Sequence, residues 1–168
     1  IGMTYDVLGR QTARTAPEGK STWGYDTRAM GAGKLAVMTA PDGNKEGYYY
    51  DDLGRLNQTI TTVSGQAYYV LRSYDAYGRL DITTYPTFFR TRHVYDNNGY
   101  LAQVINPDTG FVHWQATAAD AHGRITAETF GNGLTTAHDY DPDTGDLLAL
   151  RTGAGGNASI QNVSYTYD

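Results

Sequence analysis

Aspartates that each follow a tyrosine recur along this 168-residue chain, and aspartate is a residue type that can perform acid–base chemistry. Two carboxyl groups facing each other across a cleft can hydrolyse a glycosidic bond, one as acid and the other as base or nucleophile. The first pair is Tyr5-Asp6 and the last is Tyr167-Asp168. Catalysis requires one site and not a series of equivalent ones. The repetition therefore favours a structural role for these aspartates, and we expect no enzymatic activity.

A second group of carboxylates has spacing that resembles a calcium loop. Asp139, Asp141, Asp143 and Asp146 follow one another closely, and alternate oxygen ligands can converge on Ca²⁺. In an EF-hand loop, however, the glycine comes one position earlier than Gly145 does here, and a glutamate occupies the twelfth position. We therefore prefer a stretched turn to a metal site.

The remaining candidates for metal or nucleophilic chemistry are few. The chain has no cysteine, which excludes a disulfide framework and a thiol nucleophile. His93 and His138 each lie two residues before a tyrosine of the repeat, but two repeats apart. No phosphate-binding loop, dinucleotide fingerprint or nucleophile elbow is present. The sequence thus predicts no metal and no cofactor.

The aspartates fit a turn, which is the element that must hold them. Aspartate followed three positions later by glycine is typical of a type I turn, because aspartate accepts local backbone hydrogen bonds and glycine tolerates a positive φ. An arginine or lysine usually follows and is expected to pair with a nearby aspartate or to stack on a neighbouring tyrosine. The predicted turn residues are Asp6, Gly9, Arg10, Asp26, Gly33, Asp51, Gly54, Arg55, Asp75, Gly78, Arg79, Asp96, Gly99, Asp120, Gly123, Arg124, Asp141 and Gly145.

Strands are predicted on both sides of these turns. Apolar residues alternate after the turn, as at Leu56 and Ile60, and aromatic residues alternate before it, as at Tyr48 and Tyr50. A period of two is that of a β-strand. A second set of turns, such as Pro41-Asp42-Gly43, separates the hairpins. The most helix-prone stretch, residues 116–121, falls at the end of a predicted strand.

The fold class predicted from this pattern is all-β, as tandem antiparallel β-hairpin repeats. The copies follow one another about 23 residues apart, so residues 1–168 hold a single array of about seven repeats. Glycine bulges at the turns are expected to bend the strip. The 15 tyrosines and 20 glycines suit a thin, half-exposed sheet with many tight turns.

Charge and hydropathy exclude some partners. The net charge of −5 argues against nucleic acid and against anionic membrane surfaces, both of which favour a basic face. No apolar run approaches the roughly 18 residues of a membrane-spanning helix, so no membrane insertion is expected.

These motifs resemble those of the YD-repeat, or rearrangement-hot-spot (Rhs), family over nearly the whole chain. The resemblance rests on Tyr-Asp-x-x-Gly-Arg-Leu, as at Tyr74–Leu80. It implies a β-strip that curves into a segment of a hollow shell, excised from a larger protein that is secreted or displayed at the cell surface. It also implies, as partners, the remainder of that shell and a C-terminal toxin or effector domain enclosed by it. Animal teneurins use a similar shell in cell adhesion.

Two features lie outside that resemblance. The self-cleaving segment of bacterial members is not recognised in the sequence, since Asp141-Pro142 is the only Asp-Pro pair and the residues after it indicate a stretched turn. Aromatic side chains offer an alternative function, a carbohydrate- or cell-surface-binding module that stacks glycans. Its candidate residues are Trp23, Tyr48, Tyr50 and Trp114.

Overall fold

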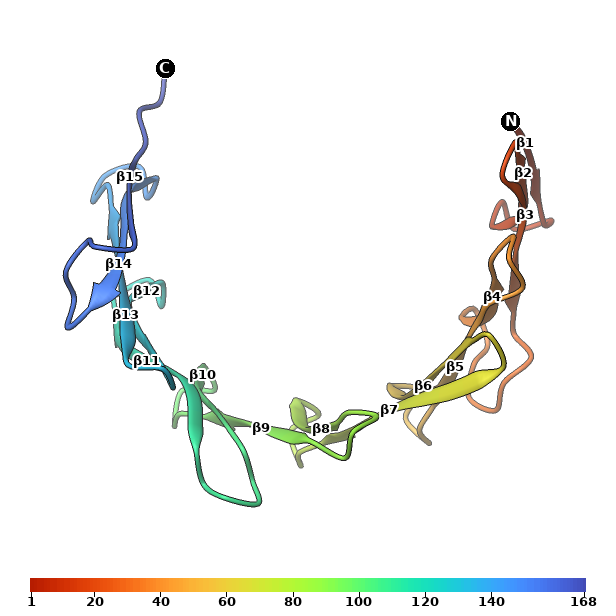
Figure 1. The fold of residues 1–168 in the computed structure, drawn as a ribbon, viewed down its shortest axis with the longest axis horizontal. Coiled ribbons are helices and arrows are strands. Elements are labelled where there is room, and N and C mark those ends of the chain that lie inside the picture. The colour runs from red at the N-terminus through yellow and green to blue at the C-terminus, as the bar shows by residue number, and fades with distance from the viewer. The chain divides into compact units, whose positions relative to one another are not determined.

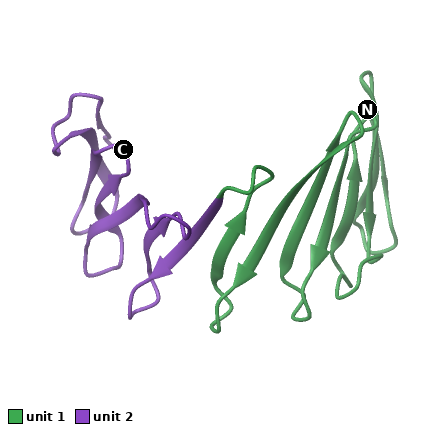
Figure 2. Cartoon of the chain, turned by 60° about the horizontal axis from the view of Figure 1, so that its bottom comes forward, with its two compact units in different colours: residues 1–89 green, residues 90–168 purple.

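The computed structural model describes residues 1–168, and every regular element in it is a β-strand. The chain divides into two compact units, Ile1–Phe89 and Arg90–Asp168, coloured separately in Figure 2. Unit 1 contains β1 (Gly2–Tyr5), β2 (Gln11–Ala16), β3 (Gly19–Tyr25), β4 (Leu35–Thr39), β5 (Lys45–Tyr50), β6 (Leu56–Val63), β7 (Gln66–Tyr74) and β8 (Leu80–Thr84). Unit 2 contains β9 (Arg90–Tyr95), β10 (Leu101–Ile105), β11 (Val112–Ala119), β12 (Ile125–Phe130), β13 (Leu134–Tyr140), β14 (Leu147–Ala154) and β15 (Gln161–Ser164).

Within each unit, every strand pairs antiparallel with the next strand along the chain, as the labels in Figure 1 allow the reader to follow. This arrangement confirms the prediction of tandem antiparallel hairpins. Ala116 and Ala119 lie at the end of β11, as expected of the helix-prone stretch, and Ala121 lies in the turn that follows. None of the chain's segments is an apolar helix of membrane-spanning length.

The sheet of each unit is a single layer. Among hydrophobic residues only Ala13 and Ala36 are buried, and no large side chain is fully buried. Many large apolar side chains are exposed instead, including Leu53, Tyr69 and Leu71. The folded state therefore depends on backbone ladders and on cross-strand side-chain pairs, each of which contributes about 0.2–1 kcal/mol.

The repeated turns have the geometry expected of Asp-x-x-Gly. In the turn at Asp51, the Gly54 N–H donates to the Asp51 carbonyl at 2.8 Å, and the Asp51 N–H donates to the Arg55 carbonyl at 2.9 Å. Gly54 has φ of 74°, a left-handed conformation that favours glycine. The same two bonds close the turns Asp6–Arg10, Asp75–Arg79, Asp96–Tyr100 and Asp120–Arg124.

Two copies are longer, as their sequences predicted. The Asp26 N–H donates to the Lys34 carbonyl, which closes a loop with Gly33 in the left-handed region. The Gly145 N–H donates to the Asp141 carbonyl one residue further along than in the regular turns. Both loops still return the chain into an antiparallel strand.

These hairpins also contain a bulge in the return strand, three residues after the turn glycine at which the sequence predicted one. In the β5–β6 pair, Tyr50 faces Leu56 and Tyr49 faces Gln58, so Asn57 is skipped. The corresponding residue of the return strand is skipped at Thr12, Ala36, Ala102, Thr126 and Leu148. The extra residue interrupts the strict two-residue alternation that was expected to begin after the turn.

One turn between hairpins was also missed. The Tyr85 N–H donates to the Phe89 carbonyl and the Phe88 N–H donates to the Tyr85 carbonyl, each at 2.8 Å. This is the pattern of the turn at Ala40–Asn44, where Gly43 has a positive φ. Here the left-handed position is held by Phe88, with φ of 63°, and no glycine marks the turn in the sequence.

We expect Phe88→Gly to stabilise the protein by about 1 kcal/mol, because glycine adopts a positive φ without the steric cost that a larger residue has. The Phe88 side chain is 86% exposed, so little packing is lost. Thr87→Gly, at a position with an ordinary φ, serves as control and should be neutral or slightly destabilising. The urea midpoint of unfolding is measured for both variants. Equal shifts of the midpoint in Phe88→Gly and Thr87→Gly would contradict the backbone strain assigned to Phe88.

Candidate functional site

The first component of the site is the aspartate carboxylate, which accepts hydrogen bonds from within its own turn. Asp51 Oδ1 accepts hydrogen bonds from the backbone N–H of Leu53 at 3.0 Å and of Arg55 at 2.8 Å. Asp51 Oδ2 accepts one from Arg55 Nε at 2.7 Å. The same three bonds form at Asp6, Asp75 and Asp120. Both oxygens are thus used to hold the turn and its arginine.

That arginine then contacts the tyrosine of the next repeat. The guanidinium carbon of Arg55 lies 4.3 Å from the ring centre of Tyr74, a cation–π geometry. Equivalent contacts are Arg10 over Tyr25 at 4.4 Å, Lys34 over Tyr50 at 4.9 Å and Arg124 over Tyr140 at 4.5 Å. The cation also reaches the neighbouring turn, since Arg124 Nη1 donates to the Gly145 carbonyl at 2.8 Å.

The tyrosine hydroxyl completes the connection. Tyr74 Oη donates to the carbonyl of Leu56, the residue after Arg55, at 2.7 Å. The hydroxyls of Tyr25, Tyr50 and Tyr167 donate in the same way to the carbonyls of Gln11, Leu35 and Leu147. We call this set of aspartate, cation, tyrosine and carbonyl contacts the corner ladder. It joins a repeat to the one that follows it, and the cation–π contact and the hydroxyl bond occur together at Tyr25, Tyr50 and Tyr74.

The corner ladder changes the acidity of its members. Hydrogen bonds from Arg10, first from its backbone and then from its side chain, lower the pKa of Asp6 despite the partial loss of hydration. Loss of hydration raises the pKa of Asp75, but the hydrogen bonds from Arg79 and Tyr77 lower it by more. Burial raises the pKa of Tyr50, which keeps its hydroxyl a donor at a pH where an exposed tyrosine would ionise.

We expect Tyr74→Phe to lower the free energy of unfolding by about 1 kcal/mol, because it removes the hydroxyl that donates to the Leu56 carbonyl while keeping the ring beneath Arg55. Tyr77→Phe is the matched control, since Tyr77 is 84% exposed in the adjacent turn. Urea unfolding followed by circular dichroism measures both changes. A neutral Tyr74→Phe would contradict the role given to the hydroxyl.

The aspartates considered for calcium have separate partners. Asp139 pairs with Arg151, Asp141 Oδ1 accepts the N–H of Asp143 and Thr144, and Asp146 accepts the Thr144 hydroxyl. No group of three or more histidine, aspartate or glutamate side chains is gathered as metal ligands require. His138 lies 4.0 Å from Glu128 and stacks on Tyr140, and His93 is on β9.

The four candidate sugar-stacking residues have different surroundings. Tyr50 belongs to the corner ladder, whereas burial and a hydrogen bond to Glu46 raise the pKa of Tyr48 to about 12. Trp23 lies on β3 opposite Met38. In unit 2, Trp114 Nε1 donates to Glu128 Oε2 at 2.6 Å. Glycan binding stays a prediction, tested by a glycan array with Trp23→Ala and Trp114→Ala.

The sequence model of the teneurin YD-shell matches residues 1–167. The chain belongs to the teneurin YD-shell family. No curated protein matches it. As a YD-shell member, it is a segment of a shell wall built from the hairpins described above.

Solved structures show the same fold. The YD-shell chain has a TM-score of 0.62 and 17% identity with the TcdB2-TccC3-Cdc42 crystal structure. The values are 0.61 and 18% for TcdB2-TccC3. For the Photorhabdus luminescens Tc holotoxin pore they are 0.52 and 15%. Each match covers 99% of this chain but only 11% or 12% of the other chain, so the chain spans about an eighth of their length or less.

Sequence reasoning found part of this YD-shell corner. The sequence predicted the turn positions of aspartate and glycine. It also predicted that the arginine would contact either an aspartate or a tyrosine ring, and Arg55 contacts both at once. The acceptor for the tyrosine hydroxyl was not foreseen. A signal existed, because the repeat uses tyrosine and never phenylalanine at that position. Such a choice indicates that the hydroxyl is bonded.

Proposed function

We propose that this YD-shell segment is part of a wall that encloses a toxin or effector domain of a larger secreted or cell-surface protein. The residues 1–168 form one array within that wall, and the partners are the remaining shell and its C-terminal cargo. The role is mechanical, since the corner carboxylates serve turns and the chain is assigned no catalytic step.

The observation that carries this proposal is the single-layered sheet with large apolar side chains exposed on it. Leu71 is 44% exposed and Tyr69 is 48% exposed, although both lie on the central part of β7. A sheet with uncovered apolar side chains favours contact with other polypeptide. An interior that holds a protein domain would provide such contact.

The comparisons support the same proposal. One similar structure is of TcdB2-TccC3 without the hypervariable C-terminal region, and another is of a Tc holotoxin pore. A protein of that kind, with a variable C-terminal region attached to a shell, is the assembly to which we assign this chain.

Protease protection of the full-length protein tests the enclosure. We expect its C-terminal domain to survive protease concentrations that digest the same domain expressed alone. Digestion of the two forms at equal rates would overturn enclosure. A glycan array with the same full-length protein distinguishes enclosure from the alternative function. Specific sugar binding that is lost in Trp114→Ala would favour a carbohydrate- or cell-surface-binding module.

A further inference from the structure

One corner of unit 2 lacks both connecting side chains of the corner ladder. After Asp96 and Gly99, the position of the arginine is held by Tyr100. In the next copy, the position of the tyrosine is held by Ala119. The Asp96 turn is otherwise regular, since Asp96 Oδ1 accepts the N–H of Asn98 and of Tyr100, each at 2.9 Å.

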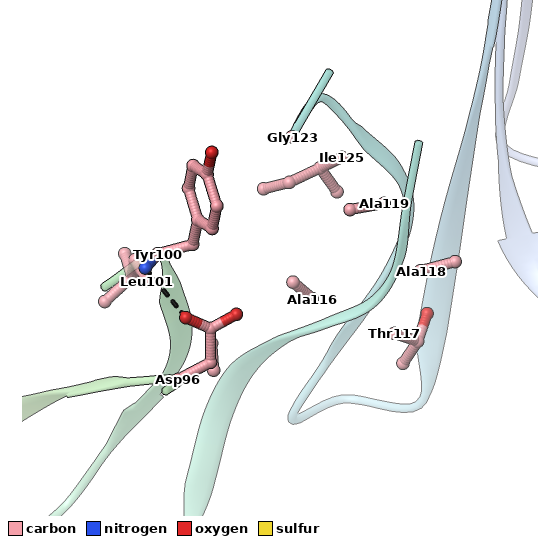
Figure 3. A pocket seen from close by; sticks show the side chains of 10 residues that line it. Asp96, Tyr100, Leu101, Ala116, Thr117, Ala118, Ala119, Gly123 and Ile125 are labelled. Carbon is pink, nitrogen blue, oxygen red and sulfur yellow. Dashed lines mark hydrogen bonds between the residues drawn. The ribbon is translucent and has the colours of Figure 1, made fainter. Parts of the chain in front are cut away.

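A cavity of about 300 Å³ occupies this corner. Figure 3 shows Asp96 and Tyr100 on one side of it and Ala116, Ala119 and Ile125 on the other. Such a volume is at the lower end of the range for small-ligand sites. The cavity lies where the tyrosine ring of a complete copy would be, because alanine supplies only a methyl group at position 119.

The other corners of the chain show what fits this space. In three of them, a phenol ring fills it and its hydroxyl donates to the carbonyl of the residue after the cation. In a fourth, the Tyr167 hydroxyl donates to the equivalent carbonyl of Leu147, although Asp146 holds the cation position there. The corresponding carbonyl here is that of Leu101, and Ala119 has no hydroxyl to offer it. The site therefore keeps the acceptor and the walls of a phenol slot.

The charge at the slot differs from that of a complete corner. At Asp51 and Asp75 the second carboxylate oxygen accepts an arginine Nε, at 2.7 and 2.8 Å. Tyr100 cannot supply that cation, so Asp96 Oδ2 has no arginine and its carboxylate borders the cavity. An incoming cation would form a charge-assisted hydrogen bond there.

We propose that this cavity binds a phenol that carries a cationic group. The phenol hydroxyl donates to the Leu101 carbonyl, and the cation pairs with Asp96 beside the Tyr100 ring. Two sources share this chemistry, namely a tyrosine next to a basic residue in a polypeptide and a free phenolic amine. The inference does not depend on enclosure of a C-terminal domain.

Ligand-observed NMR with the full-length protein tests the site with tyramine as the probe. We expect saturable binding of tyramine, and about fivefold weaker binding of p-cresol and of phenethylamine, which lack the cation and the hydroxyl respectively. Acetyl-Arg-Tyr-amide is the peptide arm. Tighter binding of the peptide than of tyramine identifies a polypeptide source, and the reverse identifies a free amine.

Two variants locate the binding. Ala119→Tyr fills the slot with the chain's own phenol, so we expect it to abolish tyramine binding and to raise the melting temperature. Ala121→Tyr, in the exposed turn nearby, is the matched control and should leave binding unchanged. Asp96→Asn should remove the preference for tyramine over p-cresol. Absence of saturable binding, or binding that neither Ala119→Tyr nor Asp96→Asn changes, would overturn the proposal.

Discussion

Replacement of Gly78 by valine is expected to lower the free energy of unfolding by about 2 kcal/mol, the largest single-residue effect that we predict. Gly78 has φ of 82°, and a β-branched residue resists that conformation. An added Cβ would meet only Arg55 Nη1, at 3.5 Å, so the cost is conformational and not a collision. Urea unfolding followed by circular dichroism measures it.

Two controls separate backbone strain from the mere addition of a side chain. Gly78→Asn should cost much less, because asparagine tolerates the left-handed region. Gly2→Val should be near neutral, since an added Cβ at Gly2 meets nothing within 4 Å and its φ is not left-handed. If Gly78→Val unfolds at the same urea concentration as Gly2→Val, the assigned turn register is wrong.

Acid is expected to destabilise the whole array, and this is the second large effect. The pKa values of Asp6, Asp51, Asp75, Asp120 and Asp141 are all lowered in the folded chain. A carboxyl with a lowered folded-state pKa stabilises the fold above its unfolded pKa, about 3.9, and loses that contribution as the pH falls through the folded value. Stability should therefore fall steeply below about pH 4.

The urea midpoint measured from pH 6 to pH 2 tests this expectation. Asp75→Asn keeps the side-chain shape but loses the charge that holds Arg79. It should lower the midpoint at pH 6 and approach the wild type at pH 2, because the wild-type carboxyl is then protonated. A midpoint that is flat between pH 6 and pH 2 would show that the corner carboxylates do not stabilise the fold.

The parts of the fold that could be predicted are those fixed by a few adjacent residues. Asp51 and Gly54 determine their turn locally, through side-chain acceptance and positive φ, so the sequence was sufficient there. The turn at Phe88 was invisible for the converse reason. This turn has the same left-handed position as the glycine turns, but phenylalanine occupies it and no residue type in the sequence marks it.

The parts that could not be predicted depend on neighbours in space. The bulge at Asn57 follows from how β5 pairs with β6, and no local residue announces it. The bond between Tyr74 and Leu56 joins positions 18 residues apart in sequence. The slot beside Ala119 depends on two substitutions in successive repeats, Tyr100 at the arginine position and Ala119 at the tyrosine position, whose side chains border one cavity.

The corner ladder has a consequence for how such proteins change length. Its cation–π contacts and tyrosine hydroxyl bonds link one copy to its immediate successor, so each complete copy presents the same donor and acceptor to its neighbours. Duplication or deletion of one complete copy, cut between equivalent glycines, would restore matched ends on both sides of the junction. A damaged copy, such as the one with Ala119, is likewise confined to its own junction. Gain or loss of whole repeats and tolerance of an incomplete repeat thus both follow from contacts that join only successive copies.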